Sequence, residues 1–206
     1  MKRLISLLLI FLAFDLSSSA QTLVSAELLK NSSLTISGST NIVPFKLFQN
    51  GDKLSRSKLT IAATQSQNKI TLSQNQLSIV VKNFVSDNPM ALRDFLKLLK
   101  SDTYPTLLVQ LNYLDLQPLS EKEDSYSGNA LVGITITGIT RHYSIPISLN
   151  SHGDLYTING IKKLSIRDFG LTPQSKMMGM IKVSEWIDID FHMICKVRTA
   201  GDVAKL

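Results

Sequence analysis

The triplet Asp168-Phe169-Gly170 is the stretch of this sequence whose residue types most directly suggest catalysis. In protein kinases such a triplet holds magnesium over the nucleotide phosphates, together with a glycine-rich loop, a strand lysine and an aspartate in a His-Arg-Asp context. None of these partners is found in the sequence. Because Pro173 follows closely, where a glycine turn is ordinary, we interpret the triplet as a structural turn. We expect Gly170 to permit the reversal, Phe169 to pack inward or across the end of the fold, and Asp168 to bind nearby backbone amides.

The histidines and the single cysteine offer no clear chemistry either. His142, His152 and His192 are far apart and lack the spacing of metal ligands, so no metal site is predicted. Cys195 has no second cysteine with which to form an internal disulfide. The neighbouring Lys196 should point to the opposite face of a strand, which favours a buried, inert thiol over a nucleophile. With no catalytic residue and no cofactor site predicted, the sequence favours a binding protein over an enzyme.

Alternation of apolar and polar residues with a period of two runs through most of the chain and predicts antiparallel strands with one buried face. Such segments occupy residues 33–37, 58–64, 76–84, 106–114, 132–138, 142–149 and 186–197. Pro146 within one of them predicts an edge or a bulge, because proline cannot donate to the ladder. In the last segment Trp186 falls out of phase, so either a bulge lies near Ser184 or Trp186 faces outward. The inward face of this segment is predicted to consist of Ile187, Ile189, Phe191, Met193, Cys195 and Val197.

One segment, residues 89–100, has helical spacing instead. Asn88 is suited to cap this helix and Pro89 to occupy its first turn, while lysines near its end favour the C-terminus. The helix is short, about three turns, so its apolar stripe predicts an element that plugs or covers the sheet rather than one that lies free on a membrane. The stripe consists of Leu92, Phe95, Leu96 and Leu99.

The N-terminus and the composition predict an exported, single-domain protein. Lys2 and Arg3 precede an apolar run at residues 4–14 that is too short to span a bilayer, and small residues end at Ala20. This order predicts a signal peptide over residues 1–20, a mature domain over residues 21–206, and a location in the periplasm or the medium. The net charge of +6 is scattered, without interleaved aromatic residues, so no nucleic-acid binding is predicted. Transient contact with anionic lipid headgroups stays open, and no protein partner is indicated.

Four blocks of sequence, in order, resemble those of the YceI-like, polyisoprenoid-binding family. "LTISGSTNIVPF" (residues 34–45) is similar to the opening strand and turn of that family, and "MALRDFLKLLKSDTYPTLLVQL" (90–111) to its helix, Tyr-Pro pair and strand. "GITITGITRHYSIPISL" (133–149) resembles its central hairpin. "LSIRDFGLTPQSKMMGMIKVSEWIDIDFHM" (164–193) resembles its C-terminal signature, in which Asp-Phe-Gly follows a strand. The resemblance covers residues 34–197.

The resemblance implies an all-β fold: a single antiparallel, lipocalin-like barrel of eight strands with one amphipathic helix. It also implies that the interior holds a long apolar chain, such as a polyisoprenoid, an isoprenoid quinone or a related lipid. A barrel of eight strands is wide enough either for packed side chains or for one slender ligand. The alternative of a structural or partner-binding barrel with a filled interior therefore stays open. If a chamber exists, the predicted apolar lining is Phe45, Leu92, Phe95, Leu99, Leu107, Val109, Ile134, Ile189, Phe191 and Met193.

Overall fold

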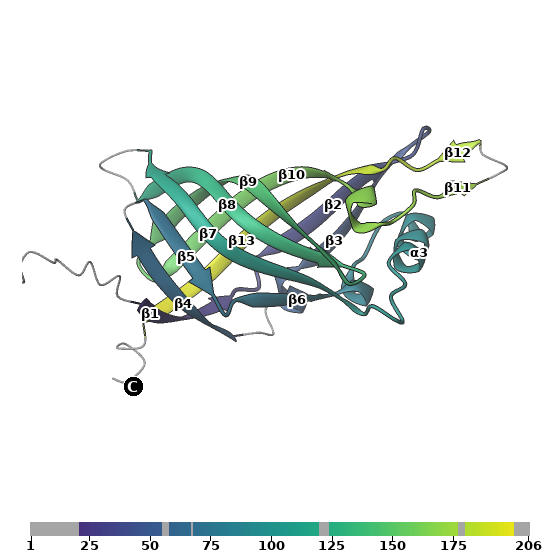
Figure 1. Ribbon diagram of the computed structural model, residues 1–206. Helices are drawn as coiled ribbons and strands as arrows, with labels where there is room; N and C mark the ends of the chain where they lie inside the picture. The colour runs from purple at the N-terminus through teal and green to yellow at the C-terminus, as the bar shows by residue number, and fades with distance from the viewer. Residues whose placement is uncertain (1–20, 55–57, 67, 120–123, 177–179, 200–206) are drawn as a thin grey trace, which may run out of the picture.

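A closed ring of eight antiparallel strands forms the body of the molecule (Figure 1). The structure, a computed structural model, describes residues 21–54, 58–66, 68–119, 124–176 and 180–199. The predicted signal peptide, residues 1–20, lies outside the described residues. The ring runs β1 (Gln21–Leu28), β4 (Lys58–Ser66), β5 (Lys69–Ser73), β7 (Thr106–Pro118), β8 (Ser125–Ile136), β9 (Ile139–His152), β10 (Leu155–Ser165) and β13 (Trp186–Thr199), and β13 pairs with β1 to close it. The predicted all-β, eight-stranded barrel is confirmed.

Two long strands extend the barrel beyond this ring, because each of them pairs in turn with two shorter strands along the same edge. β13 pairs with β1 near its C-terminal end and with β2 (Ser33–Ser39) farther back. β7 pairs with β5 near its C-terminal end and with β6 (Gln76–Val80) at its start. β3 (Pro44–Asn50) pairs with β2, and Phe48 and Val85 exchange two backbone hydrogen bonds of 2.9 Å just beyond β6. The barrel is therefore longer than its eight-stranded ring alone.

The side chain of Asn75 fixes the connection between β5 and β6. Gln74 adopts a positive φ of 60°, which breaks the strand at this point. The amide of Asn75 then donates to the carbonyl of Leu111 and accepts from its N–H, both at 2.7 Å. Asn75 thus replaces one rung of the backbone ladder. β7, the strand opposite this break, is itself irregular at the same place, because its register against β8 shifts between Leu111 and Tyr113.

The principal helix, α3 (Pro89–Leu98), lies at one end of the barrel, together with the short strands β11 (Ser175–Lys176) and β12 (Ile181–Lys182) (Figure 1). The side chain of Asn88 accepts hydrogen bonds from the N–H groups of Met90 and Ala91, as its predicted capping role requires. The helix ends at Leu98 rather than at the predicted Lys100, which has a positive φ of 48°. A four-residue helix, α2 (Gly51–Leu54), and two 3-10 turns, η1 (Val81–Asn83) and η2 (Ile166–Phe169), complete the described elements.

Pro146 marks the point where β9 and β10 separate. Their pairing stops at Ile147 and Gly160, directly beside the proline, which has no N–H to donate. Beyond this point side chains connect the two segments. Lys162 Nζ donates to the carbonyl of Ser144 at 3.0 Å, and two further bonds reach η2 at Asp168. β9 stays paired with β8 from Ile139 to Asn150, so the separation affects only the edge of β9 that faces β10.

The Asp168-Phe169-Gly170 triplet closes this separation. Tyr143 Oη donates to the Asp168 carboxylate at 2.9 Å, and Arg141 Nε donates to the Asp168 carbonyl at 2.8 Å. The expectation that Asp168 binds backbone amides is wrong, because its carboxylate binds this tyrosine instead. Phe169 is buried, and its ring lies 6.2 Å from that of Tyr143. Gly170 ends η2 in the left-handed conformation, with φ 69°, as a structural turn requires. Desolvation, together with the bond to Asp168, raises the pKa of the Tyr143 hydroxyl well above its ordinary value.

Candidate ligand chamber

The barrel encloses a cavity of about 470 Å³. Its wall is formed by the inward faces of the strands, and α3 and the β11–β12 segment border it at one end. Almost all lining side chains are apolar. The polar side chains among the described lining residues are Thr40, Asn75, Asn88, Asp94, Gln174 and Ser184. Because the amide of Asn75 is already bonded to Leu111, the chamber wall offers a long chain mainly dispersion and hydrophobic contacts.

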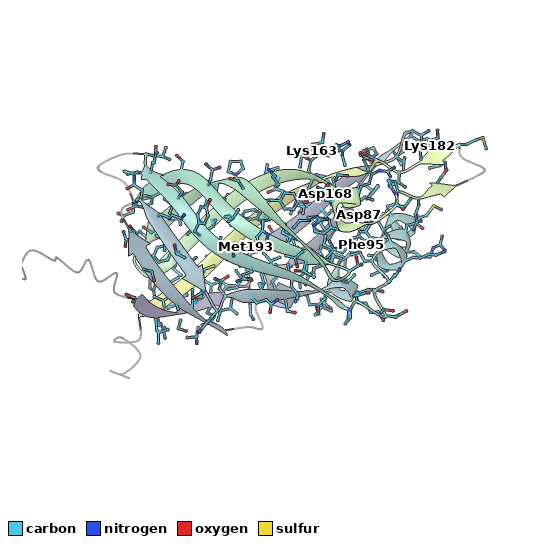
Figure 2. All side chains as sticks on the ribbon, viewed as in Figure 1. Asp87, Phe95, Lys163, Asp168, Lys182 and Met193 are labelled. Carbon is cyan, nitrogen blue, oxygen red and sulfur yellow. The ribbon has the colours of Figure 1, made fainter. Side chains whose placement is uncertain are left out.

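Nine of the ten side chains predicted to line a chamber do border this cavity. Phe45 comes from β3, Phe95 and Leu99 from α3 and its C-terminal cap, and Leu107 and Val109 from β7. The others are Ile134 of β8 and Ile189, Phe191 and Met193 of β13. Leu92 is not among the lining residues; it is half-buried and packs against the core. Figure 2 labels Phe95, on α3 at one end of the barrel, and Met193, which lies deeper along the barrel.

Several lining residues were not singled out from the sequence. Ala26 of β1, Ile61 of β4 and Ile145 of β9 face the cavity from strands whose alternation could have revealed them. Other lining residues, such as Ile42 and Gln174, belong to turns. A turn has no period from which an inward face can be read, so sequence patterns give no signal for these positions.

Two glycines keep the chamber wide. Gly38 and Phe45 are cross-strand partners on β2 and β3, and a Cβ added to Gly38 would lie 2.5 Å from Phe45 Cζ. Gly160 and Phe191 are partners on β10 and β13, with the same 2.5 Å approach to Phe191 Cζ. Each phenyl ring therefore lies over a position without a side chain. A larger residue at either glycine would displace the ring, and at Gly38 the three nearest atoms all belong to the ring of Phe45.

The contact between α3 and the barrel is aromatic. The rings of Phe95 and Phe84 meet edge to face, with centroids 5.2 Å apart and planes at 68°. Phe84 follows η1 and is buried, whereas Phe95 is only partly buried and borders the chamber. Edge-to-face pairs of this kind contribute about 0.5–1.5 kcal/mol beyond the area that they bury. One face of Phe95 thus fixes α3 while another part of the same side chain is available to a ligand.

Cys195 also borders the chamber, from β13. Burial raises the pKa of its thiol to about 11, so the group is protonated at neutral pH. The prediction of a buried, inert thiol agrees with this environment. Trp186, at the start of the same strand, is half exposed and faces outward. The register against β2 also shifts at this point, because Val183 pairs with Thr40 but Asp188 pairs with Ser37. The outward Trp186 and the bulge near Ser184 are therefore both present.

Neither a metal site nor a membrane-spanning helix emerges from the described part of the chain. Within it, no group of three or more His, Cys, Asp and Glu side chains is placed to hold a metal ion. Of the helices in those same segments, none is both long and apolar enough to cross a bilayer.

A closed antiparallel barrel around an apolar chamber defines a lipocalin-like architecture. No family model matches the chain, and neither does any curated protein. The crystal structure of BcnA from Burkholderia cenocepacia is similar over 79% of this chain and 95% of its own, with 18% identity and a TM-score of 0.53. A polyisoprenoid-binding domain from Saccharophagus degradans, implicated in plant cell wall breakdown, is similar over 84% of this chain and 98% of its own, with 11% identity and a TM-score of 0.56. The fold implied by the sequence resemblance is therefore confirmed: the chain has the YceI-like barrel fold.

Proposed function

We propose that this protein is a non-enzymatic carrier that holds a long apolar molecule, such as a polyisoprenoid, an isoprenoid quinone or a similar lipid, inside the barrel. The observation that carries the proposal is the apolar chamber of about 470 Å³. Ligand sites in proteins commonly have volumes of roughly 300–1,000 Å³. Each methylene that leaves water for such a chamber contributes ~0.8 kcal/mol, so a slender chain needs few polar contacts to bind firmly. The similar fold of a polyisoprenoid-binding domain supports this choice of ligand class.

The chamber favours a carrier over a packed barrel. A barrel whose interior was filled by its own side chains would leave no space of this size, since protein interiors are close-packed.

The distribution of polar lining residues also suggests how a ligand would lie. Thr40, Gln174 and Ser184 line the cavity near the end where the β2–β3 turn meets the β11–β12 segment. A polar headgroup would stay at this end, because deeper positions provide no partner for it.

We further propose that the protein is exported, with residues 1–20 removed as a signal peptide. The support comes from the sequence: Lys2 and Arg3 precede an apolar run at residues 4–14, and small residues end at Ala20. Sequencing the N-terminus of the protein from the periplasm or medium should give Gln21 first, whereas a cytoplasmic protein that retains residues 1–20 would contradict export.

Extraction of the purified protein with organic solvent is the direct test of the carrier function. We expect an isoprenoid or another long-chain lipid in the extract, at up to one molecule per protein, and native mass spectrometry should show the same mass as a non-covalent adduct. The protein should be purified without detergent, because detergent would compete for the chamber. A folded protein that carries no lipid, and takes none up from added isoprenoid quinone, would support the packed barrel instead.

Phe95→Asp should remove most of the bound lipid while leaving the strands folded. The carboxylate would stand where α3 borders an apolar chamber, and a charge there has no partner that could offset its desolvation. Phe95→Leu is the matched control, because it keeps an apolar side chain at the same place and should retain the lipid. Lipid per folded protein is the quantity to measure, with strand content checked by circular dichroism. If Phe95→Asp keeps its full lipid content, α3 does not form part of the binding site.

A further inference from the structure

Four large apolar side chains are exposed around the end of the barrel that carries α3. Ile42 and Val43, in the turn between β2 and β3, are 65% and 48% exposed. Met90, at the start of α3, is 53% exposed, and Met180, directly before β12, is 65% exposed. We call these four residues the apolar rim. Three of them, Ile42, Val43 and Met90, also line the chamber, so the exposed rim adjoins the apolar interior.

Hydrogen bonds fix the backbone of the segments that carry Ile42, Val43 and Met180. Thr40 Oγ1 accepts hydrogen bonds from the N–H groups of Ile42 and Val43, and the Thr40 N–H donates to the carbonyl of Val43. The side chain of Asn41 donates to the carbonyl of Met180 and accepts from the N–H of Lys182, both at 2.9 Å. The Asn41 N–H also donates to the carbonyl of Lys182. These bonds join the turn and the segment before β12 into one projection, which carries the exposed Ile42 and Met180.

This rigidity distinguishes the rim from an ordinary surface loop. Exposed apolar side chains are common singly and need no explanation. Here they come from three segments distant in sequence, they surround the same opening, and polar side chains fix two of those segments together. The apolar rim could therefore enter an apolar medium without a change in its backbone conformation.

The charges beside the rim indicate which apolar medium this is. Lys182 is exposed on β12, two residues after Met180, and Arg93 and Lys97 are exposed on α3 (Figure 2 labels Lys182). Asp87, exposed just before α3, and Asp94, half-buried in the cavity wall, are the acidic groups on the same segments. The cations exceed the anions on these segments, and the net charge of +6 for the whole chain becomes +5 without Lys2, Arg3 and Asp15 of the proposed signal peptide. Such a balance favours a surface of anionic headgroups.

We propose that the apolar rim inserts into the headgroup region of an anionic lipid bilayer, with Lys182 beside it on the headgroups. The inference rests on the proposed function, since it names the source from which the carrier takes its lipid. A long apolar chain that left a bilayer through water would lose its favourable environment before reaching the chamber. Contact of the rim with the bilayer shortens that step, because Ile42, Val43 and Met90 would touch the membrane and also line the chamber.

Flotation with lipid vesicles tests this inference. The purified protein is mixed with vesicles of phosphatidylcholine and phosphatidylglycerol in equal parts, and with vesicles of phosphatidylcholine alone. We expect binding to the mixed vesicles that weakens with added salt. The double variant Ile42→Asp/Met180→Asp should bind them at least about tenfold more weakly, because two inserting side chains are lost and two carboxylates are added. Lys182→Glu should weaken binding to the mixed vesicles alone.

Leu119→Asp provides the matched control. Leu119 is 64% exposed, close to the values for Ile42 and Met180, and it follows β7 at the opposite end of the barrel (Figure 1). This variant should bind vesicles like the unchanged protein. Circular dichroism should show the same strand content for all variants, since every substituted side chain is exposed.

Three results would overturn the inference: no binding of the unchanged protein to mixed vesicles, equal binding by the rim variant, or equal weakening by Leu119→Asp. If analytical ultracentrifugation shows a dimer that the rim variant abolishes while vesicles do not bind, a second copy covers the rim instead. The lipid content of the same preparations separates this question from the proposed function. Lipid in the chamber without rim-dependent vesicle binding contradicts the docking surface alone, whereas rim-dependent binding by a protein that never contains lipid contradicts the carrier.

Discussion

Ala130→Trp is expected to weaken lipid binding strongly while the barrel remains folded. Ala130 is buried on β8 and lines the chamber, so an indole at this position enters the space of about 470 Å³ that the ligand would fill. Displacing three or four methylenes of a bound chain forfeits about 2.4–3.2 kcal/mol at ~0.8 kcal/mol each. An affinity loss of roughly 50- to 200-fold follows, since every 1.4 kcal/mol is a factor of ten. Titration with an isoprenoid quinone, followed by intrinsic fluorescence or native mass spectrometry, measures it.

Asn129→Trp is the control for this substitution. Asn129 is the neighbouring residue on β8 and is exposed, so the same indole would project from the outer face of the barrel. Lipid binding should therefore be unchanged. A protein with Ala130→Trp that still bound a full complement of lipid would show that the chamber is not the binding site, and the carrier function would have to be located elsewhere or abandoned.

Phe169→Ala should have the largest effect on stability. Phe169 is 1% exposed, it belongs to the buried core, and its ring packs against Tyr143 across the separation between β9 and η2. Truncation of a fully buried phenylalanine costs about 3–5 kcal/mol through lost burial and the cavity that remains. That is a large part of the roughly 5–15 kcal/mol by which a domain of this kind is stable. Equilibrium unfolding in urea, monitored by circular dichroism, gives the free energy of unfolding.

Phe191→Ala separates packing from chamber lining. The chemistry of the substitution is the same, but Phe191 is only partly buried and borders the open cavity. Fewer contacts are lost and little new space is created, so we expect a clearly smaller decrease in the free energy of unfolding, together with weaker lipid binding. Equal destabilisation by the two substitutions would mean that the interior around Phe191 is packed, which would contradict the chamber.

The sequence by itself determined the class of fold and the inward faces of its strands. The alternation from Ile187 to Cys195 places one set of side chains inward whatever strands lie beside β13, because successive residues of a strand always point to opposite faces. The cap at Asn88 is equally local, since its partners Met90 and Ala91 are two and three residues away. The triplet at Asp168 could be recognised as a turn for the same reason: the conformation of Gly170 depends on its immediate neighbours.

Only the tertiary structure decided whether the interior is open and what surrounds its mouth. The chamber depends on the strand register that sets Phe45 over Gly38 and Phe191 over Gly160, and register follows from pairings that no local pattern records. The partner of Asp168 is Tyr143, 25 residues earlier, and so the carboxylate was assigned to the wrong donors. The bond from Asn41 to Met180 joins residues 139 positions apart. The alternation of apolar and polar residues can be read along one segment. Which segments lie next to each other is decided only when the strands pair and the ring closes, because that pairing brings their ends to the same side of the barrel.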